Sequence, residues 1–266
     1  LLAGGDPPVT GDAPRPGGLT LRAMVPNAIT AAALCAGLTG IRFAITGDFE
    51  KAVLAVVLAG LLDGIDGRIA RALKAQSRFG AELDSLADNV SFGVAPALIL
   101  FMWSLQDVPR FGWFASLAFA VCMSLRLARF NARIDMPDEP RKQAGFLTGV
   151  PAPVGAGLAF LPLYLSFETD LGWVRDPWLV GGWLAAIAFL LISALPTLSW
   201  GKLRPRRHIR LEVIGLFGLV LGGGLLTETW WTLIAICAVY VTLLPVGMIA
   251  YSRVRRQRAA APDAAG

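Results

Sequence analysis

The stretch DGIDGRIARALKAQSRFGAELDSLAD, residues 63–88, decides how this chain is interpreted, because it sets four aspartates within an otherwise apolar sequence. Asp63 and Asp66 lie three residues apart, and Asp84 and Asp88 lie four residues apart. If both segments are helical, each pair occupies one helix face, and a tight turn would let the two faces meet. Facing carboxylates repel one another unless cations neutralise them. The stretch therefore predicts a divalent-metal site between two helices.

The composition indicates a polytopic membrane protein. Of 266 residues, 55% are hydrophobic and 16% are charged, and the mean hydropathy is +0.60. A bilayer-spanning helix needs about 20 apolar residues, and eight stretches of the chain approach that length. They are residues 26–46, 52–73, 82–104, 111–132, 152–168, 178–197, 211–226 and 230–251. We therefore expect an all-α transmembrane helical bundle of eight spans.

The basic residues predict the orientation of these spans, because cytoplasmic connections carry an excess of Lys and Arg. With both termini and every second connection placed in the cytoplasm, only four of the 24 basic residues lie outside. These four are Arg42, Lys51, Arg110 and Arg175. Both chain ends and the aspartate stretch should then face the cytoplasm. The net charge of +5 is explained by contact with anionic lipid headgroups, and it indicates no nucleic-acid binding.

Cysteine and histidine usage excludes other kinds of chemistry. Cys35, Cys122 and Cys237 all fall in apolar segments, where they are expected to be small packing residues and not a disulfide framework. The single histidine, His208, lies among arginines. A His-rich zinc site and a catalytic triad with a buried histidine are therefore both excluded.

Polar and small residues at the same depth as the aspartates are candidate substrate contacts. Asn27 and Thr30 lie one turn apart at the start of the first span, although Asn27 could equally be a helix cap there. Gly67, Ala70 and Gly80 share the aspartate faces and leave room for a phosphate group beside the metals. The alternative for the aspartates themselves is a structural network of ion pairs with neighbouring arginines.

Basic residues in and after the fourth span are candidate anion contacts. Arg126 and Arg129 lie at the cytoplasmic edge of its apolar run, within reach of the same cavity. Asn131 follows at the end of the span, and Lys142 lies in the next polar loop.

The aspartate stretch resembles the signature of the CDP-alcohol phosphatidyltransferase family. It matches every fixed position of the pattern DxxDGxxAR, then eight residues, then GxxxDxxxD. The surrounding segments PNAIT at 26–30, RLARFN at 126–131 and FLTGVPAP at 146–153 resemble those bacterial members whose acceptor alcohol is serine. The likeness is good over residues 24–165 and general beyond them.

The resemblance implies a reaction and a set of roles. The family moves a phosphatidyl group from CDP-diacylglycerol to an alcohol, here L-serine, and releases CMP with the help of two Mg²⁺ or Mn²⁺ ions. By position, the metal ligands would be Asp63, Asp66, Asp84 and Asp88, and Asp88 would also be the general base. The CDP-diacylglycerol contacts would be Asn27, Thr30, Gly67, Ala70, Arg71 and Gly80. The serine contacts would be Arg126, Arg129, Asn131 and Lys142.

The resemblance also implies an organisation of the chain. A cytoplasmic tail at 1–23 would precede the enzyme domain at 24–200, which has about six core spans. A basic loop with two added spans at 201–252 and a basic tail at 253–266 would follow. The expected form is a homodimer in the cytoplasmic membrane of a bacterium, with its active site facing the cytoplasm.

Two alternatives stay open at this stage. The acceptor could be glycerol 3-phosphate, inositol phosphate or choline, because all of these would use the same aspartates. The aspartates could instead form the ion site of a cation transporter or channel. A transport pathway should carry polar residues on both sides of the bilayer midplane, whereas here they gather at the cytoplasmic end, which favours an enzyme.

Overall fold

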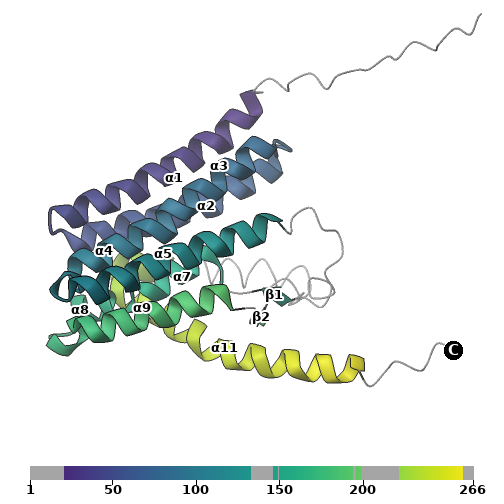
Figure 1. Ribbon diagram of the computed structural model, residues 1–266. Helices are drawn as coiled ribbons and strands as arrows, with labels where there is room; N and C mark the ends of the chain where they lie inside the picture. The colour runs from purple at the N-terminus through teal and green to yellow at the C-terminus, as the bar shows by residue number, and fades with distance from the viewer. Residues whose placement is uncertain (1–20, 133–145, 149, 194–195, 199–221, 260–266) are drawn as a thin grey trace, which may run out of the picture.

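The computed structural model describes residues 21–132, 146–148, 150–193, 196–198 and 222–259. Most of its helices run roughly along one direction, and α11 crosses the others at an angle (Figure 1). The helices are α1 (Leu21–Ile45), α2 (Phe49–Ala72), α3 (Arg78–Asp88), α4 (Ala95–Trp103), α5 (Pro109–Ala132), α7 (Ala152–Ala159), α8 (Leu161–Glu168), α9 (Pro177–Ile192) and α11 (Thr229–Ala259). Short 3₁₀ turns lie at η2 (Leu105–Asp107) and η3 (Gly172–Arg175). The predicted helical class is confirmed.

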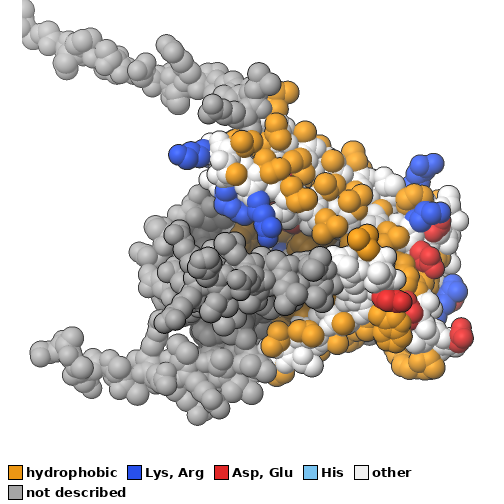
Figure 2. Space-filling model, turned by 180° about the vertical axis from the view of Figure 1, so that it is seen from behind, with side chains coloured by type: hydrophobic (Ala, Val, Ile, Leu, Met, Phe, Trp, Pro, Cys, Tyr) orange, Lys and Arg blue, Asp and Glu red, His pale blue; other side chains and the backbone are white. Residues whose placement is uncertain are grey.

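Three described helical segments are long and apolar enough to cross a membrane: Met24–Ile45, Arg78–Trp103 and Pro109–Ala132. Their outward side chains are large and apolar, with Phe114 of α5 exposed by 70%. Figure 2 shows hydrophobic side chains across the middle of the surface and charged ones gathered towards the two ends. Such exposure is unfavourable in water and suits a lipid environment. The protein is therefore a membrane protein.

Most of the expected spans overlap observed helices, with three differences. The stretch expected at 178–197 extends past the end of α9 at Ile192 into strand β2 (Pro196–Leu198). The segment expected at 152–168 is divided into α7 and α8, because Pro162 near the start of α8 cannot continue the hydrogen bonds of α7. Most of the stretch expected at 211–226 lies outside the described residues.

One pair of strands was not predicted by the all-α class. Strand β1 (Phe146–Thr148) pairs antiparallel with β2 (Pro196–Leu198), and Leu147 lies opposite Thr197. These segments precede α7 and follow α9, so the pair joins the two ends of that helical unit. Strands of three residues are too short to show a recognisable alternation of apolar and polar residues.

A tight turn makes α1 and α2 an antiparallel hairpin. Gly47 has φ +81°, a conformation that favours glycine. Asp48 then caps α2 by accepting a hydrogen bond from the Lys51 backbone N–H, and its carboxylate forms an ion pair of 2.6 Å with Lys51 Nζ. The hydrogen bond from the Lys51 side chain lowers the pKa of Asp48. These contacts fix where α2 starts, and so which of its residues reach the far end of the bundle.

The third span holds a widened turn between two α-helical parts. Helix α3 continues through a π-helical segment, η1 (Asn89–Val94), into α4. The close approaches made by η1 depend on two glycines: a Cβ on Gly37 of α1 would lie 2.8 Å from Ser91 Cα, and one on Gly93 would lie 3.1 Å from Met123 Cγ of α5. Helices α1 and α5 therefore pack directly against η1, next to Asp88, the last aspartate of the signature.

The contact at Gly37 gives a stability prediction. Gly37→Ala should lower the free energy of unfolding by about 1–3 kcal/mol, because the new methyl group overlaps the Ser91 backbone. Gly182→Ala in α9 is the matched control, since its Cβ would meet nothing within 4 Å. Thermal unfolding in detergent micelles measures both. Equal melting temperatures for the two variants would contradict the close contact.

Candidate active site

The turn between α2 and α3 brings the two halves of the signature together. Helix α2 ends at Ala72, and Lys74 adopts a positive φ of 50° that reverses the chain. Ser77 then caps α3 by accepting a hydrogen bond of 3.0 Å from the Gly80 N–H. The tight turn expected between the two helical segments is thus found at residues 73–77.

Three of the aspartates form a compact acidic group. One carboxylate oxygen from each of Asp63, Asp66 and Asp84 lies within 4.8 Å of the other two. Asp66 is buried, with 4% of its surface exposed, and the other two are partly buried. Carboxylate oxygens are the donors that Mg²⁺ and Mn²⁺ prefer, and partial burial makes their charges costly without a cation. The acidic group fits a divalent metal ion, and the predicted meeting of the two faces is confirmed.

Asp88 lies at the edge of the acidic group. It is the last residue of α3 and is partly buried. Its carboxylate interacts electrostatically with Asp63, with Asp84 and with the Arg126 guanidinium of α5. Asp88 therefore lies near both the acidic group and an arginine of α5.

Helix α1 contributes the two polar residues that the sequence singled out. The buried Thr30 hydroxyl donates a hydrogen bond of 2.5 Å to Asp66 Oδ2. The side-chain oxygen of Asn27 would lie 2.9 Å from a Cβ on Gly80, so only glycine leaves this side chain undisturbed. Thr30 thus orients a candidate metal ligand, and Asn27 lies against the start of α3.

Small residues on α2 leave space beside the acidic group. The nearest atom to a Cβ on Gly67 is the Arg71 guanidinium nitrogen Nη1 at 3.7 Å, an ordinary contact distance. Gly67 and Ala70 are partly buried, and Arg71 is exposed. An elongated polar ligand can therefore lie along this face of α2.

The structure distinguishes the four candidate acceptor contacts. Arg126 is the one described candidate that interacts with Asp88. Arg129 Nη1 donates a hydrogen bond of 2.7 Å to the Ile192 carbonyl at the end of α9, and Asn131 Nδ2 donates one of 2.8 Å to Ser85 Oγ of α3. These two residues have structural partners, and their predicted role in acceptor binding stays a prediction. Lys142 lies outside the described residues.

The polar contacts that join α5 to α3 and η1 were not predicted from the sequence. Ser124 of α5 donates a hydrogen bond of 2.8 Å to Asn89 Oδ1, one residue after Asp88. This hydrogen bond and the one between Asn131 and Ser85 hold α5 against the span that carries Asp84 and Asp88. The available signal was the presence of polar residues within apolar helices.

The comparisons agree with this geometry. A family model described as CDP-alcohol phosphatidyltransferase matches residues 23–197. The chain belongs to this family. Members of the family generally depend on divalent metals, which is consistent with the acidic group. The matched segment begins two residues after the start of α1 and includes the rest of the helices up to α9, and α11 lies beyond it.

Several curated relatives carry the name CDP-diacylglycerol–serine O-phosphatidyltransferase. The protein from Mycobacterium leprae (strain TN) is 44% identical over 173 residues, which are 65% of this chain and 57% of the relative. The protein from Helicobacter pylori (strain J99) is 32% identical over 197 residues, 74% of this chain and 81% of the relative. The protein from Bacillus subtilis (strain 168) is 32% identical over 171 residues, 64% of this chain and 88% of the relative. The match thus spans less than two thirds of the mycobacterial relative.

The hydrogen bond from Thr30 gives a binding prediction. Thr30→Val should weaken Mn²⁺ binding about tenfold, because Asp66 loses the donor that orients it. Thr39→Val on the same helix is the control, since that hydroxyl bonds only to the Cys35 carbonyl of its own helix. Titration of Mn²⁺ followed by electron paramagnetic resonance in detergent measures both affinities. Equal affinities in both variants would mean that Thr30 does not support the metal site.

Proposed function

We propose that this chain transfers the phosphatidyl group of CDP-diacylglycerol to L-serine, forming phosphatidylserine and CMP in phospholipid biosynthesis. The observation that carries the proposal is the convergence of Asp63, Asp66 and Asp84 on one point in a member of this family. Serine as the acceptor follows from the shared name of the relatives. Glycerol 3-phosphate, inositol phosphate and choline are the alternatives that an assay must exclude.

In this proposal the four aspartates hold two Mg²⁺ or Mn²⁺ ions. The bound ions would neutralise the diphosphate of CDP-diacylglycerol. Thr30 keeps Asp66 in position for this role. The remaining CDP-diacylglycerol contacts would be Asn27, Gly67, Ala70, Arg71 and Gly80, which line the open face of α2 and the start of α3.

Asp88 is the proposed general base. It takes the proton from the serine hydroxyl, whose oxygen then forms a bond to the phosphorus next to diacylglycerol while the bond from that phosphorus to the bridging oxygen breaks and CMP leaves. Arg126 faces Asp88 and is the proposed partner of the serine carboxylate. Arg129, Asn131 and Lys142 are proposed as outer acceptor contacts.

The turn between α2 and α3 lies at the end of the bundle where α1 starts and α5 ends (Figure 1). We propose that this end faces the cytoplasm of a bacterium, with both chain termini on the same side and eight spans in its cytoplasmic membrane. The enzyme domain would be residues 24–200, with tails at 1–23 and 253–266 and a basic loop with two added spans at 201–252. A homodimer is the proposed assembly.

An acceptor assay tests the proposed function. Purified protein with CDP-diacylglycerol and Mn²⁺ should release CMP when L-serine is added, and a chelator should abolish the release. Glycerol 3-phosphate, inositol phosphate and choline, each in place of serine, should give only background release. Turnover with one of these compounds and none with serine would overturn the acceptor assignment.

The proposed roles of two aspartates can be separated by mutation. Asp88→Asn should lower kcat at least about 100-fold and retain metal-dependent binding of CDP-diacylglycerol, because it removes the base and keeps an oxygen donor. Asp66→Ala should lose both turnover and metal-dependent binding. Glu82→Gln, an exposed carboxyl change on α3, is the control and should behave as the wild type. Near-normal turnover by Asp88→Asn would exclude it as the base.

A further inference from the structure

Helix α11 forms one wall of a cavity between helices, which is open to the surface at Leu61 and Ile236, although α11 lies beyond the segment that the family model matches. The cavity has a volume of about 220 Å³ and is lined mainly by apolar residues of α2, α7, α8 and α11. Cys237 of α11 is buried, and its Sγ donates a hydrogen bond of 3.5 Å to the Gly157 carbonyl of α7. This contact fixes the helix so that the next turn, which carries Tyr240, also faces the interior.

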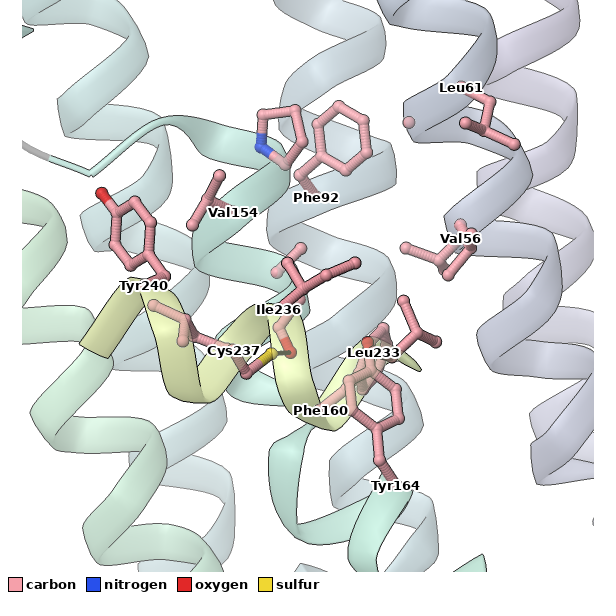
Figure 3. Close-up of a pocket in the computed structure, with 16 residues that line it drawn as sticks. Val56, Leu61, Phe92, Val154, Phe160, Tyr164, Leu233, Ile236, Cys237 and Tyr240 are labelled. Atoms are coloured by element: carbon pink, nitrogen blue, oxygen red, sulfur yellow. Dashed lines mark hydrogen bonds between the residues drawn. The ribbon is translucent and has the colours of Figure 1, made fainter. Parts of the chain in front are cut away.

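The Tyr240 hydroxyl is buried and has no hydrogen-bond partner among the described residues. In Figure 3 the hydroxyl points away from Tyr164 and away from the middle of the cavity, on the side opposite to Val56 and Leu61. A buried hydroxyl without a partner is costly, and a bound ligand would supply the partner.

Arg126 of α5 also carries a buried polar atom that lacks a hydrogen-bond partner in the described ranges. Its Nε is buried without a hydrogen-bond partner among the described residues. Across the described part of the chain the only ion pair joins Lys51 to Asp48, so Arg126 has no carboxylate within ion-pair distance there. Its guanidinium interacts electrostatically with both Asp88 and Tyr240. Arg126 therefore lies near both the proposed base and the hydroxyl of Tyr240, and both Arg126 and Tyr240 carry a buried polar atom without a partner among the described residues.

We propose that Tyr240 and Arg126 together bind the carboxylate of the acceptor amino acid, so that α11 completes the acceptor end of the active site. The Arg126 guanidinium can only donate hydrogen bonds and the Tyr240 hydroxyl can donate one, so a ligand with acceptor oxygens satisfies both, and the charge of Arg126 favours an anion. This inference rests on the proposed function.

The size of serine supports the assignment. Its hydroxyl oxygen must lie at Asp88 to lose its proton, and only the α and β carbons separate that oxygen from the carboxylate. An anion contact beside Asp88 is therefore within reach of the carboxylate of the same molecule. The phosphates of the lipid belong on the other side of Asp88, at the acidic group of Asp63 and Asp84.

Tyr240→Phe tests the inference because it removes the hydroxyl and keeps the ring. Its KM for L-serine should rise about tenfold, with kcat and the KM for CDP-diacylglycerol little changed, as expected for the loss of one hydrogen bond to a charged group. The ratio of kcat/KM for L-serine to that for its methyl ester, which lacks the charged carboxylate, should fall by a similar factor. A loss of packing alone would not alter this ratio.

Tyr164→Phe is the matched control. Tyr164 on α8 is also buried, its hydroxyl also has no partner among the described residues, and it lines the other end of the same cavity. Its removal should leave the KM for L-serine and the ester ratio unchanged.

The outcomes separate the inference from the proposed function. If the wild type uses serine and Tyr240→Phe retains its KM and ester ratio, the inference is wrong and the proposed function stands. Equal effects of Tyr164→Phe and Tyr240→Phe would also overturn it. If the wild type releases no CMP with serine, the proposed function fails and the inference fails with it.

Discussion

The mutual repulsion of three carboxylates is the constraint on which this structure depends. Asp63, Asp66 and Asp84 come from two helices, yet their oxygens meet within 4.8 Å in partly buried surroundings. The helices cannot easily move apart, because the capped turn before Gly80 joins them and α1 packs against both of them. A bound cation would turn this repulsion into attraction. The scaffold therefore holds the three carboxylates in an arrangement that a divalent metal ion would stabilise.

The helices and the acidic group could be predicted from the sequence because both depend on local spacing. Intervals of three and four residues fix a helix face, and apolar length identifies a span. The strand pair, the division at Pro162 and the partners of Arg129 and Asn131 could not be predicted, because they depend on which distant segments pack together. Tyr240 was missed for the same reason, since a tyrosine in an apolar helix has no local signal.

Arg126 interacts with residues of the signature and of α11. Its guanidinium interacts electrostatically with Asp88, which belongs to the signature, and with Tyr240, which lies after the segment matched by the family model. Under the two proposals above, the lipid would bind at residues of the signature, and the acceptor would bind at a surface to which a later part of the chain contributes. Acceptor choice could then change without altering the acidic group.

The π-helical segment η1 begins directly after Asp88. A π turn contains one residue more than an α turn, so it rotates everything beyond it by about 100° relative to a regular helix. All residues of α4 are buried or partly buried, so the whole helix packs inside the protein. The widened turn therefore allows α4 to pack in one register while Asp84 and Asp88 keep another, although all of them belong to one continuous span.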